Sequence, residues 1–107
     1  MIVSTTERVP GRDVTEILGP AWGVVVRSRG IGGNVAAAFR SLGGGEIKEY
    51  TAMLEDARRN AVDRLVQNAA VMQADAVIMM RFDSSEIGQT MSEVVAYGTA
   101  VRLSPMP

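Results

Sequence analysis

The chain has 107 residues, of which 47% are apolar, 21% charged and 5% aromatic, and its formal net charge is −1. This length corresponds to a single domain, residues 1–107, with one modest hydrophobic core. Eleven basic residues against twelve acidic ones exclude a basic surface that captures nucleic acid or a membrane. Because the chain contains neither Cys nor His, disulfides, thiol and imidazole catalysis and thiolate zinc sites are also excluded.

The sequence carries no recognisable export or membrane signal. Its first residues lack a basic stretch followed by about 7–15 apolar residues, so we expect no cleaved signal peptide. Apolar runs such as residues 76–80 and 94–97 are far shorter than the ~20 residues of a membrane helix. We therefore expect a cytoplasmic protein.

The first part of the chain predicts two strands with a short helix between them. Ile2 to Thr5 is rich in β-branched residues and predicts a brief strand. Asp13 and Glu16 have the spacing of a helix-capping pair, and Gly19 follows as a residue that ends helices. The alternating segment from Trp22 to Arg29 predicts the second strand.

The central part predicts two helices separated by glycines. Asn34 is a suitable N-cap for a short helix over residues 34–42, which Gly43 to Gly45 end. From Glu46 to Gln73, apolar residues recur at steps of three and four, which predicts a long amphipathic helix. They are Ile47, Tyr50, Leu54, Ala57, Ala61, Leu65, Ala69 and Met72.

Two further strands are predicted after the long helix. They run from Asp75 to Asp83 and from Glu93 to Leu103, and Ser84 to Gln89 form a hairpin loop between them. Together the elements predict an α+β fold in which one long helix packs on a small antiparallel sheet.

The last strand carries uncharged residues on both of its faces over most of its length. One face has small residues, Ala96, Gly98 and Ala100, which favour a close approach of the long helix. The other face has larger ones, including Val95, Tyr97, Val101 and Leu103. Because one helix covers only one face, we predict that a second copy covers the other and that the protein is a homo-oligomer. The alternative is a monomer whose amino-terminal strand and short helices fold over that face.

Two glycine-rich segments lie where phosphate-binding loops occur. Gly30 and Gly32 precede a helix, but Val35 takes the place of the third glycine of a dinucleotide-binding pattern. Gly43 to Glu46 lacks the Lys and the Ser or Thr of a P-loop. We interpret both segments as turns, while the amides at the start of the long helix are a candidate site for a small anion.

Carboxylates are the hard metal ligands that the sequence offers. Asp83, Glu86 and Glu93 flank the hairpin and are candidate ligands of Mg²⁺, Ca²⁺ or Mn²⁺. The alternative is that they solvate the hairpin tip or pair with arginines. Methionines such as Met72, Met79 and Met80 are either soft-metal ligands or, more commonly, side chains that fill gaps in a core.

Arg27, Arg29 and Arg81 occupy odd positions on predicted strands, as does Asp83. If neighbouring strands align, these residues form a charge network on one face of the sheet. Repeated by symmetry, the network either lines a pore that binds anions or forms salt bridges between subunits. No pair of titratable groups has the arrangement of a catalytic acid and base, so we predict that the protein is not an enzyme.

Short motifs in the chain resemble the YbjQ-like family of small bacterial and archaeal proteins, which is labelled as heavy-metal-binding. The motifs are Ser4-Thr-Thr6, Gly30-Ile-Gly-Gly-Asn34, Gly44-Gly45, Tyr50 with Leu54, Ala57-Arg58 and Ala61, Ala74-Asp75-Ala76-Val77, and Gly98-Thr-Ala-Val101. Their order and spacing extend over nearly the whole chain.

The resemblance implies a β-β-α-α-β-β subunit, similar to the dodecin-like class, that assembles into a closed ring, commonly a homopentamer. Its label implies a bound metal ion, and a divalent ion would suit the carboxylates. Asn34, Tyr50, Arg58 and Asp75 match the family's motifs and are candidates for a shared site. Each also has a structural interpretation, as a helix cap, a packing residue, an interface contact and a turn residue, respectively.

We therefore predict a ring-forming homo-oligomer of unknown physiological role that binds a metal ion or small ligand at clefts between subunits or in a pore. One alternative is a structural or regulatory assembly module without a ligand. Another is an enzyme that uses a cation held by carboxylates such as Glu46 and Asp83.

Overall fold

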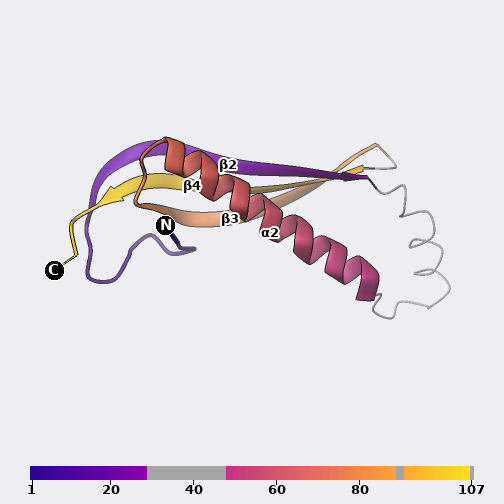
Figure 1. Cartoon of the computed structure of the whole chain (residues 1–107), viewed down its shortest axis with the longest axis horizontal. Helices are drawn as coiled ribbons and strands as arrows, with labels where there is room; N and C mark the ends of the chain where they lie inside the picture. Colours follow the sequence, from indigo (N-terminus) through magenta and orange to yellow (C-terminus); the bar gives the residue numbers. More distant parts are fainter. Residues whose placement is uncertain (29–47, 89–90, 107) are drawn as a thin grey trace.

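The computed structural model describes residues 1–28, 48–88 and 91–106. In these residues the strands are β1 (Ile2–Val3), β2 (Val14–Ser28), β3 (Ala76–Ile87) and β4 (Met91–Leu103), and the helix is α2 (Lys48–Val71). The strands form one sheet in the order β1-β3-β4-β2, and α2 lies against it (Figure 1). β1 is parallel to β3, whereas β4 is antiparallel to both β3 and β2. The predicted α+β class is confirmed, and the sheet is mixed rather than purely antiparallel.

The predicted helix after Asp13 is wrong, because this segment is the beginning of β2. Val14 lies opposite Leu103 of β4, and Ile17 lies opposite Val101. Pairing with β4 satisfies the main-chain groups of the segment, and this long-range ladder prevails over the local capping pattern. Gly19 follows a shift of register and has a φ of 128°, so it serves an irregular strand rather than a helix end.

The hairpin between β3 and β4 is longer than the sequence predicts. Ser84 and Ser85 pair with Val94 and Glu93, so the predicted loop from Ser84 to Gln89 is largely strand. Gly88 follows β3 with a φ of 62°, a left-handed conformation that suits a turn glycine. The predicted helix over residues 34–42 lies outside the described residues.

The long helix packs on the sheet through the stripe that its periodicity predicts. Ala57, Ala61, Leu65 and Ala69 are buried at successive steps of four residues. They share a core with small and branched residues of the strands, which are Ala21, Val25, Val77, Val94, Ala96 and Ala100. The prediction that the small face of the last strand lies under the helix is confirmed for Ala96 and Ala100.

Gly23 of β2 is the point at which helix and sheet approach most closely. A Cβ atom at this position would lie 2.2 Å from the carbonyl oxygen of Ala61 and 2.4 Å from the amide nitrogen of Leu65. Two side chains of α2 hold the same strand, since Arg64 donates to the carbonyl oxygen of Val24 at 2.6 Å and Asn68 to that of Trp22 at 2.7 Å. The helix is therefore seated over the edge strand β2.

Gly98 of β4 packs against β3, whereas the sequence predicts a close contact with the long helix. A Cβ atom there would lie 2.6 Å from Val77 Cγ1 and 2.8 Å from the carbonyl oxygen of Ile78, both in β3. The strand β3 has a bulge at this level, where Met79 has a φ of 56° and the register shifts between Ile78 and Arg81. Gly98 thus accommodates the bulge rather than the helix.

The amino-terminal segment binds to this bulge. Met79 and Met80 donate main-chain hydrogen bonds to Thr6 and Ser4, and the amide of Ser4 donates to the carbonyl oxygen of Val77 at 2.9 Å. The amino-terminal segment therefore covers one end of the sheet face that is turned away from α2. Both chain ends lie toward that end of the sheet (Figure 1).

The amino-terminal segment also encloses part of the surface for which the sequence predicts a partner subunit. Val101 is fully buried and Leu103 is 6% exposed, in a second small cluster with Ala76 and the half-buried Val9 and Ile78. The prediction that a second copy covers Val101 and Leu103 is therefore wrong. The chain covers these two residues itself, as the monomer alternative foresaw, but it leaves Tyr97 43% exposed.

The contact at Gly23 predicts a large cost for adding one methyl group. Gly23→Ala should lower the free energy of unfolding by about 3 kcal/mol, because main chain rather than a flexible side chain must move. Gly11→Ala is the matched control, because Gly11 has a φ of 79° but nothing within 4 Å of its added Cβ. It should cost about 1 kcal/mol, from backbone strain alone. Urea unfolding measures both, and equal costs would contradict the close contact at Gly23.

Candidate functional site

The face of the sheet turned away from α2, hereafter the open face, carries exposed apolar side chains. Its residues alternate along the strands with those buried under the helix and form three consecutive rows across β3, β4 and β2. The rows are Arg81–Tyr97–Trp22, Asp83–Val95–Val24 and Ser85–Glu93–Val26. Trp22 is 55% exposed and Val26 50% exposed. The open face is apolar along β2 and becomes polar toward β3.

A shallow groove lies on the other face, between α2 and β3. It has a volume of about 340 Å³ and is lined by Arg58, Arg59, Val62, Asp63 and Phe82. The guanidinium of Arg58 lies over the Phe82 ring, 5.1 Å from its centroid, a cation–π arrangement. Because α2 is seated over β2, Phe82 at the β3 side stays half-buried.

The carboxylates predicted to bind a metal do not form one cluster. Asp83 and Glu93 belong to the open face, whereas Glu86 pairs with Ser92 and belongs to the helix face. The Oδ1 atom of Asp83 accepts from the amide of Ser84 at 2.9 Å, and Glu93 accepts from the hydroxyl of Ser85 at 3.1 Å. In the described part of the chain, no group of three or more Asp and Glu side chains could hold a metal ion.

The predicted arginine network is divided between the two faces of the sheet. Arg27 pairs with Ser92 and follows Gly23 and Val25 on the helix face. Arg81 lies beside Tyr97 on the open face, where its Nη1 donates to the carbonyl oxygens of Thr5 and Met80, each at 2.8 Å. The bulge at Met79 adds one residue to β3 and so reverses which residues face the helix. Arg29 lies outside the described residues.

The four positions shared with the family lie in different parts of the structure or outside the described residues. Asn34 lies outside the described residues, and Tyr50 lies in the first turn of α2. Arg58 contacts Phe82 in the groove. Asp75 lies between α2 and β3 and is hydrogen-bonded to β4. Its amide donates to the carbonyl oxygen of Val101 at 2.9 Å, and its Oδ2 accepts from the amide of Leu103 at 2.8 Å. Its predicted role as a turn residue is therefore supported.

Two of the three methionines named as alternative soft-metal ligands take part in packing. Met72 and Met80 are half-buried against the main core cluster, which agrees with the interpretation of these side chains as gap fillers. For Met79 that interpretation is wrong, because this residue lies in the bulge of β3 and is 43% exposed.

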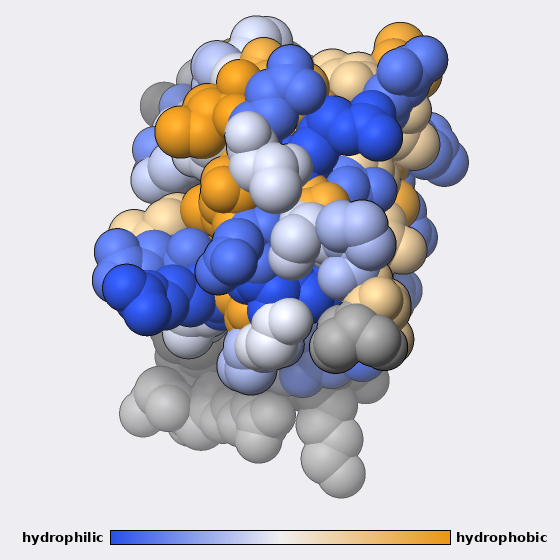
Figure 2. Space-filling view, turned by 90° about the vertical axis from the view of Figure 1, so that its left-hand side faces the viewer, coloured by the Kyte–Doolittle hydropathy of each residue, from blue (hydrophilic) through white to orange (hydrophobic). Residues whose placement is uncertain are grey.

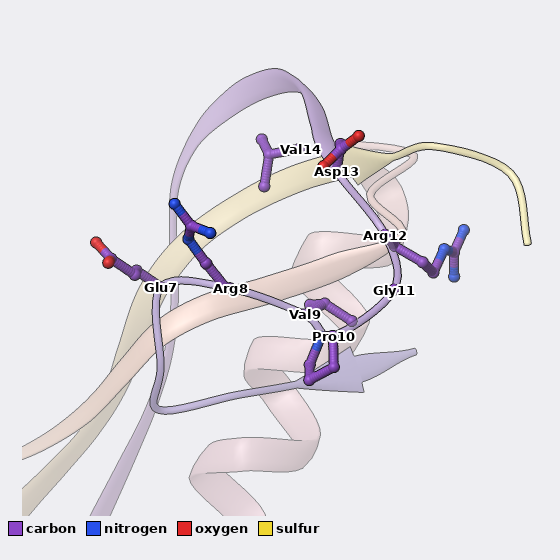
Figure 3. A pocket seen from close by; sticks show the side chains of 8 residues that line it. All are labelled: Glu7, Arg8, Val9, Pro10, Gly11, Arg12, Asp13 and Val14. Atoms are coloured by element: carbon purple, nitrogen blue, oxygen red, sulfur yellow. The ribbon is translucent and has the colours of Figure 1, made fainter.

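A hollow at one end of the molecule is formed by the loop of residues 7–14 (Figure 3). It has a volume of about 780 Å³. The loop is fastened to the carboxyl-terminal end, since Arg12 Nε donates to the carbonyl oxygen of Ser104 at 2.8 Å and the Ser104 amide donates to Asp13 at 2.8 Å. Two arginines and two acids balance in charge around it, so the hollow carries no net field that would favour an anion.

The same end of the molecule shows hydrophilic and hydrophobic side chains interspersed over its surface (Figure 2). This view contains no broad patch of one kind. In the described residues, no helix combines the length and the apolar character needed to cross a membrane.

Trp22 and the groove are site candidates that the sequence patterns did not single out. A signal for Trp22 was nevertheless present, because it alternates with Ala21 and Gly23. Residues this small favour a strand face pressed against another backbone, so the bulky neighbour belongs to the opposite face. No comparable signal existed for the groove, which depends on where the helix sits.

These features describe a small α+β domain with one helix on a four-stranded sheet, an incompletely covered open face and no metal cluster within the described residues. A family model described as "Putative heavy-metal-binding", the YbjQ family, matches residues 1–104. The chain therefore belongs to the YbjQ family, and the resemblance noted from its motifs is confirmed.

Similar proteins carry names that state no activity. A UPF0145 protein of Bradyrhizobium sp. (strain ORS 278) is 66% identical over 105 residues, which are 98% of this chain and 95% of that protein. A UPF0145 protein of Thermoplasma volcanium is 57% identical over 101 residues, 94% of this chain and 83% of that protein.

A solved structure shares the fold. It is the crystal structure of a protein of unknown function of the DUF74 family from Pediococcus pentosaceus, with a TM-score of 0.65 and 14% identity. The match covers 97% of this chain and 98% of the other. At this identity the likeness concerns the fold alone.

The Asp75 contacts predict a measurable structural role for this residue. Asp75→Ala should lower the free energy of unfolding by about 1.5–3 kcal/mol, because the amide of Leu103 loses a charged acceptor. Asp75→Asn keeps an acceptor oxygen and should cost less. Urea unfolding of the three proteins measures both effects, and an alanine variant as stable as the parent would show that the contact contributes nothing.

Proposed function

We propose that this protein is a non-catalytic assembly protein that forms a closed homo-oligomeric ring through its open face. Five copies is the number that the family resemblance implies. A metal ion or small ligand would then bind where copies meet, in a cleft or a pore, rather than within one subunit.

The observation that carries the proposal is the exposure of Trp22 and Tyr97 in the first row of the open face and of Val26 in the third, with the apolar pair Val24 and Val95 between them. Contiguous apolar patches of this kind mark interfaces on proteins. Trp and Tyr are also among the residues that contribute most to binding between proteins. The polar margin along β3, with Arg81 and Asp83, resembles the rim of such an interface.

The placement of the ligand between copies is supported by what one subunit offers. Asp83 and Glu93 share the open face on neighbouring strands, so one copy presents two carboxylates beside the proposed interface. Ca²⁺ takes about six to eight oxygen ligands, which is more than two carboxylate side chains supply. A second copy can supply the missing ligands.

A structural or regulatory ring without a ligand is the second candidate. It is favoured by the absence of a group of three or more potential metal ligands among residues 1–28, 48–88 and 91–106. The two candidates share the assembly and differ in their response to metal ions.

Assembly is tested by placing a charge on the open face. Val26→Arg should convert the oligomer to a monomer, because a long charged side chain in place of an exposed valine must be desolvated at the interface and disrupts its apolar packing. Val71→Arg is the matched control, since Val71 is 84% exposed at the end of α2 and lies away from the open face. Native mass spectrometry and sedimentation should give a mass several times 11.4 kDa for the parent and the control only.

Two outcomes would contradict the proposed assembly. One is a parent protein that sediments as an 11.4 kDa monomer at micromolar concentration. The other is a Val26→Arg variant that assembles as well as Val71→Arg does, since the open face would then lie outside the interface.

Metal binding is tested by thermal unfolding with Mn²⁺, Mg²⁺ and Ca²⁺, with and without EDTA. A ligand that binds the folded state raises Tm. We expect a higher Tm in the parent ring and no change in the monomeric Val26→Arg variant, because the site needs two copies. An equal rise in both proteins would place the site within one subunit, and no rise in either would favour the ring without a metal ligand.

A further inference from the structure

We infer that Trp22 of one copy inserts into the groove between α2 and β3 of the next copy, an inference that rests on the proposed assembly. The groove is the one lined by Arg58, Val62, Asp63 and Phe82. The occupant is a second copy of this chain, and the contact joins two different surfaces.

Trp22 has the properties of an anchoring side chain. It is the only Trp in the sequence, and it is 55% exposed. Its main chain is held in place, because β4 pairs with it through Tyr97 and Asn68 of α2 donates to its carbonyl oxygen at 2.7 Å. A large side chain on a fixed backbone loses little conformational freedom on binding, which favours its use as an anchor.

The groove offers complementary chemistry to an indole ring. Val62 and Phe82 provide apolar surface, and aromatic pairs gain from their edge and face arrangement. Arg58, already placed over the Phe82 ring, carries the cation most often found over aromatic rings, and Trp offers the most favourable ring face for such a contact. Asp63 at the rim provides an acceptor for the indole N–H group.

The positions of the two surfaces favour a ring over a two-fold dimer. Trp22 lies on β2, one edge strand of the sheet, and on the open face. The groove lies at β3, on the far side of β4 from β2, and on the helix face. A contact between different surfaces repeats from copy to copy, and it forms a closed ring when the rotation between neighbours closes.

The inference is tested with variants that each damage one half of the contact. Trp22→Ala removes the anchor but keeps the groove. Val62→Arg fills the groove but keeps the anchor, and Val66→Arg is its matched control, because Val66 is also half-buried on α2 one turn further on but does not line the groove. Circular dichroism and thermal unfolding establish that each variant is folded.

We expect Trp22→Ala and Val62→Arg to raise the dissociation constant of assembly by at least about 30-fold, and Val66→Arg to leave it within a few-fold of the parent. Mixed in equal amounts, the first two variants should form a one-to-one pair. The reason is that the Val62→Arg copy still offers Trp22 and the Trp22→Ala copy still offers an intact groove. An interface made of the same surface on both copies gives no such rescue.

Tryptophan fluorescence, excited selectively over tyrosine, provides an independent measurement, because Trp22 is the only Trp in the sequence. In the parent assembly the emission should be blue-shifted and protected from iodide quenching, and Val62→Arg should abolish both effects. Arg58→Glu, at an exposed position, replaces the cation without disturbing the core and should weaken assembly about 10-fold.

The outcomes separate this inference from the proposed function. A monomeric parent would overturn both. A parent that forms an oligomer, together with a Val62→Arg variant that assembles normally or a variant mixture that forms no pair, would overturn the inference and leave the assembly proposal standing.

Discussion

The main chain of α2 lies directly on the main chain of β2 at Gly23, where even a single methyl group would collide with the carbonyl oxygen of Ala61. This proximity requires small residues around it, and Ala57, Ala61 and Ala69 provide them on the helix. It also determines where the helix sits. Arg64 and Asn68 bond the outer carbonyl oxygens of β2, so the helix covers the β2 edge of the sheet and cannot also cover β3.

The position of the helix explains both candidate surfaces. Because α2 is seated over β2, Phe82 on β3 stays half-buried with Arg58 above it, and a groove remains. Because a single helix covers a single face, the open face is left to the amino-terminal segment, which reaches Val101 and Leu103 but not Tyr97. The close packing of α2 on β2 at Gly23 thus leaves both the Trp22 side chain and the groove at Phe82 accessible.

The bulge at Met79 is the second determinant of the surface chemistry. It reverses the alternation of β3 after Ile78, so Phe82 faces the helix and Arg81 and Asp83 face outward. Without the extra residue, the charged pair would lie under the helix and the phenyl ring would lie on the open face. The Ser4-Thr-Thr6 segment bonds the same bulge, which links the fold of the amino-terminal segment to the distribution of charge on the open face.

What the sequence predicted well depends on regular periodicity. The helix stripe at Ala57, Ala61 and Leu65 and the small face of β4 follow from patterns that repeat over many residues. The stripe is confirmed, and the small face is confirmed at Ala96 and Ala100. The motif resemblance identified the family correctly. Tertiary pairing was not predictable in the same way. The capping pattern of Asp13 and Glu16 is a local preference, and pairing with β4 prevailed over it.

The candidate site was predictable only in part, and for the same reason. Alternation along β4 identified Tyr97 and Val95 as surface in need of cover. A single added residue in β3, however, is invisible to a periodicity analysis, and it separated Arg27 from Arg81. The groove at Arg58 and Phe82 requires the position of the helix across the sheet, which depends on Gly23 rather than on any pattern in α2.

The proposed ring and the family's heavy-metal label are compatible under one condition. A chain without Cys and His offers neither thiolate nor imidazole ligands, and its described carboxylates form no group of three. Asp83 and Glu93 nevertheless lie on the open face, in the two rows that follow the row of Tyr97 and Trp22. Under the proposed function, association would bring further oxygen atoms toward these two carboxylates. Metal affinity in this chain would then depend on assembly, because the two carboxylates of one copy leave most of the coordination sphere of a Ca²⁺ ion to water.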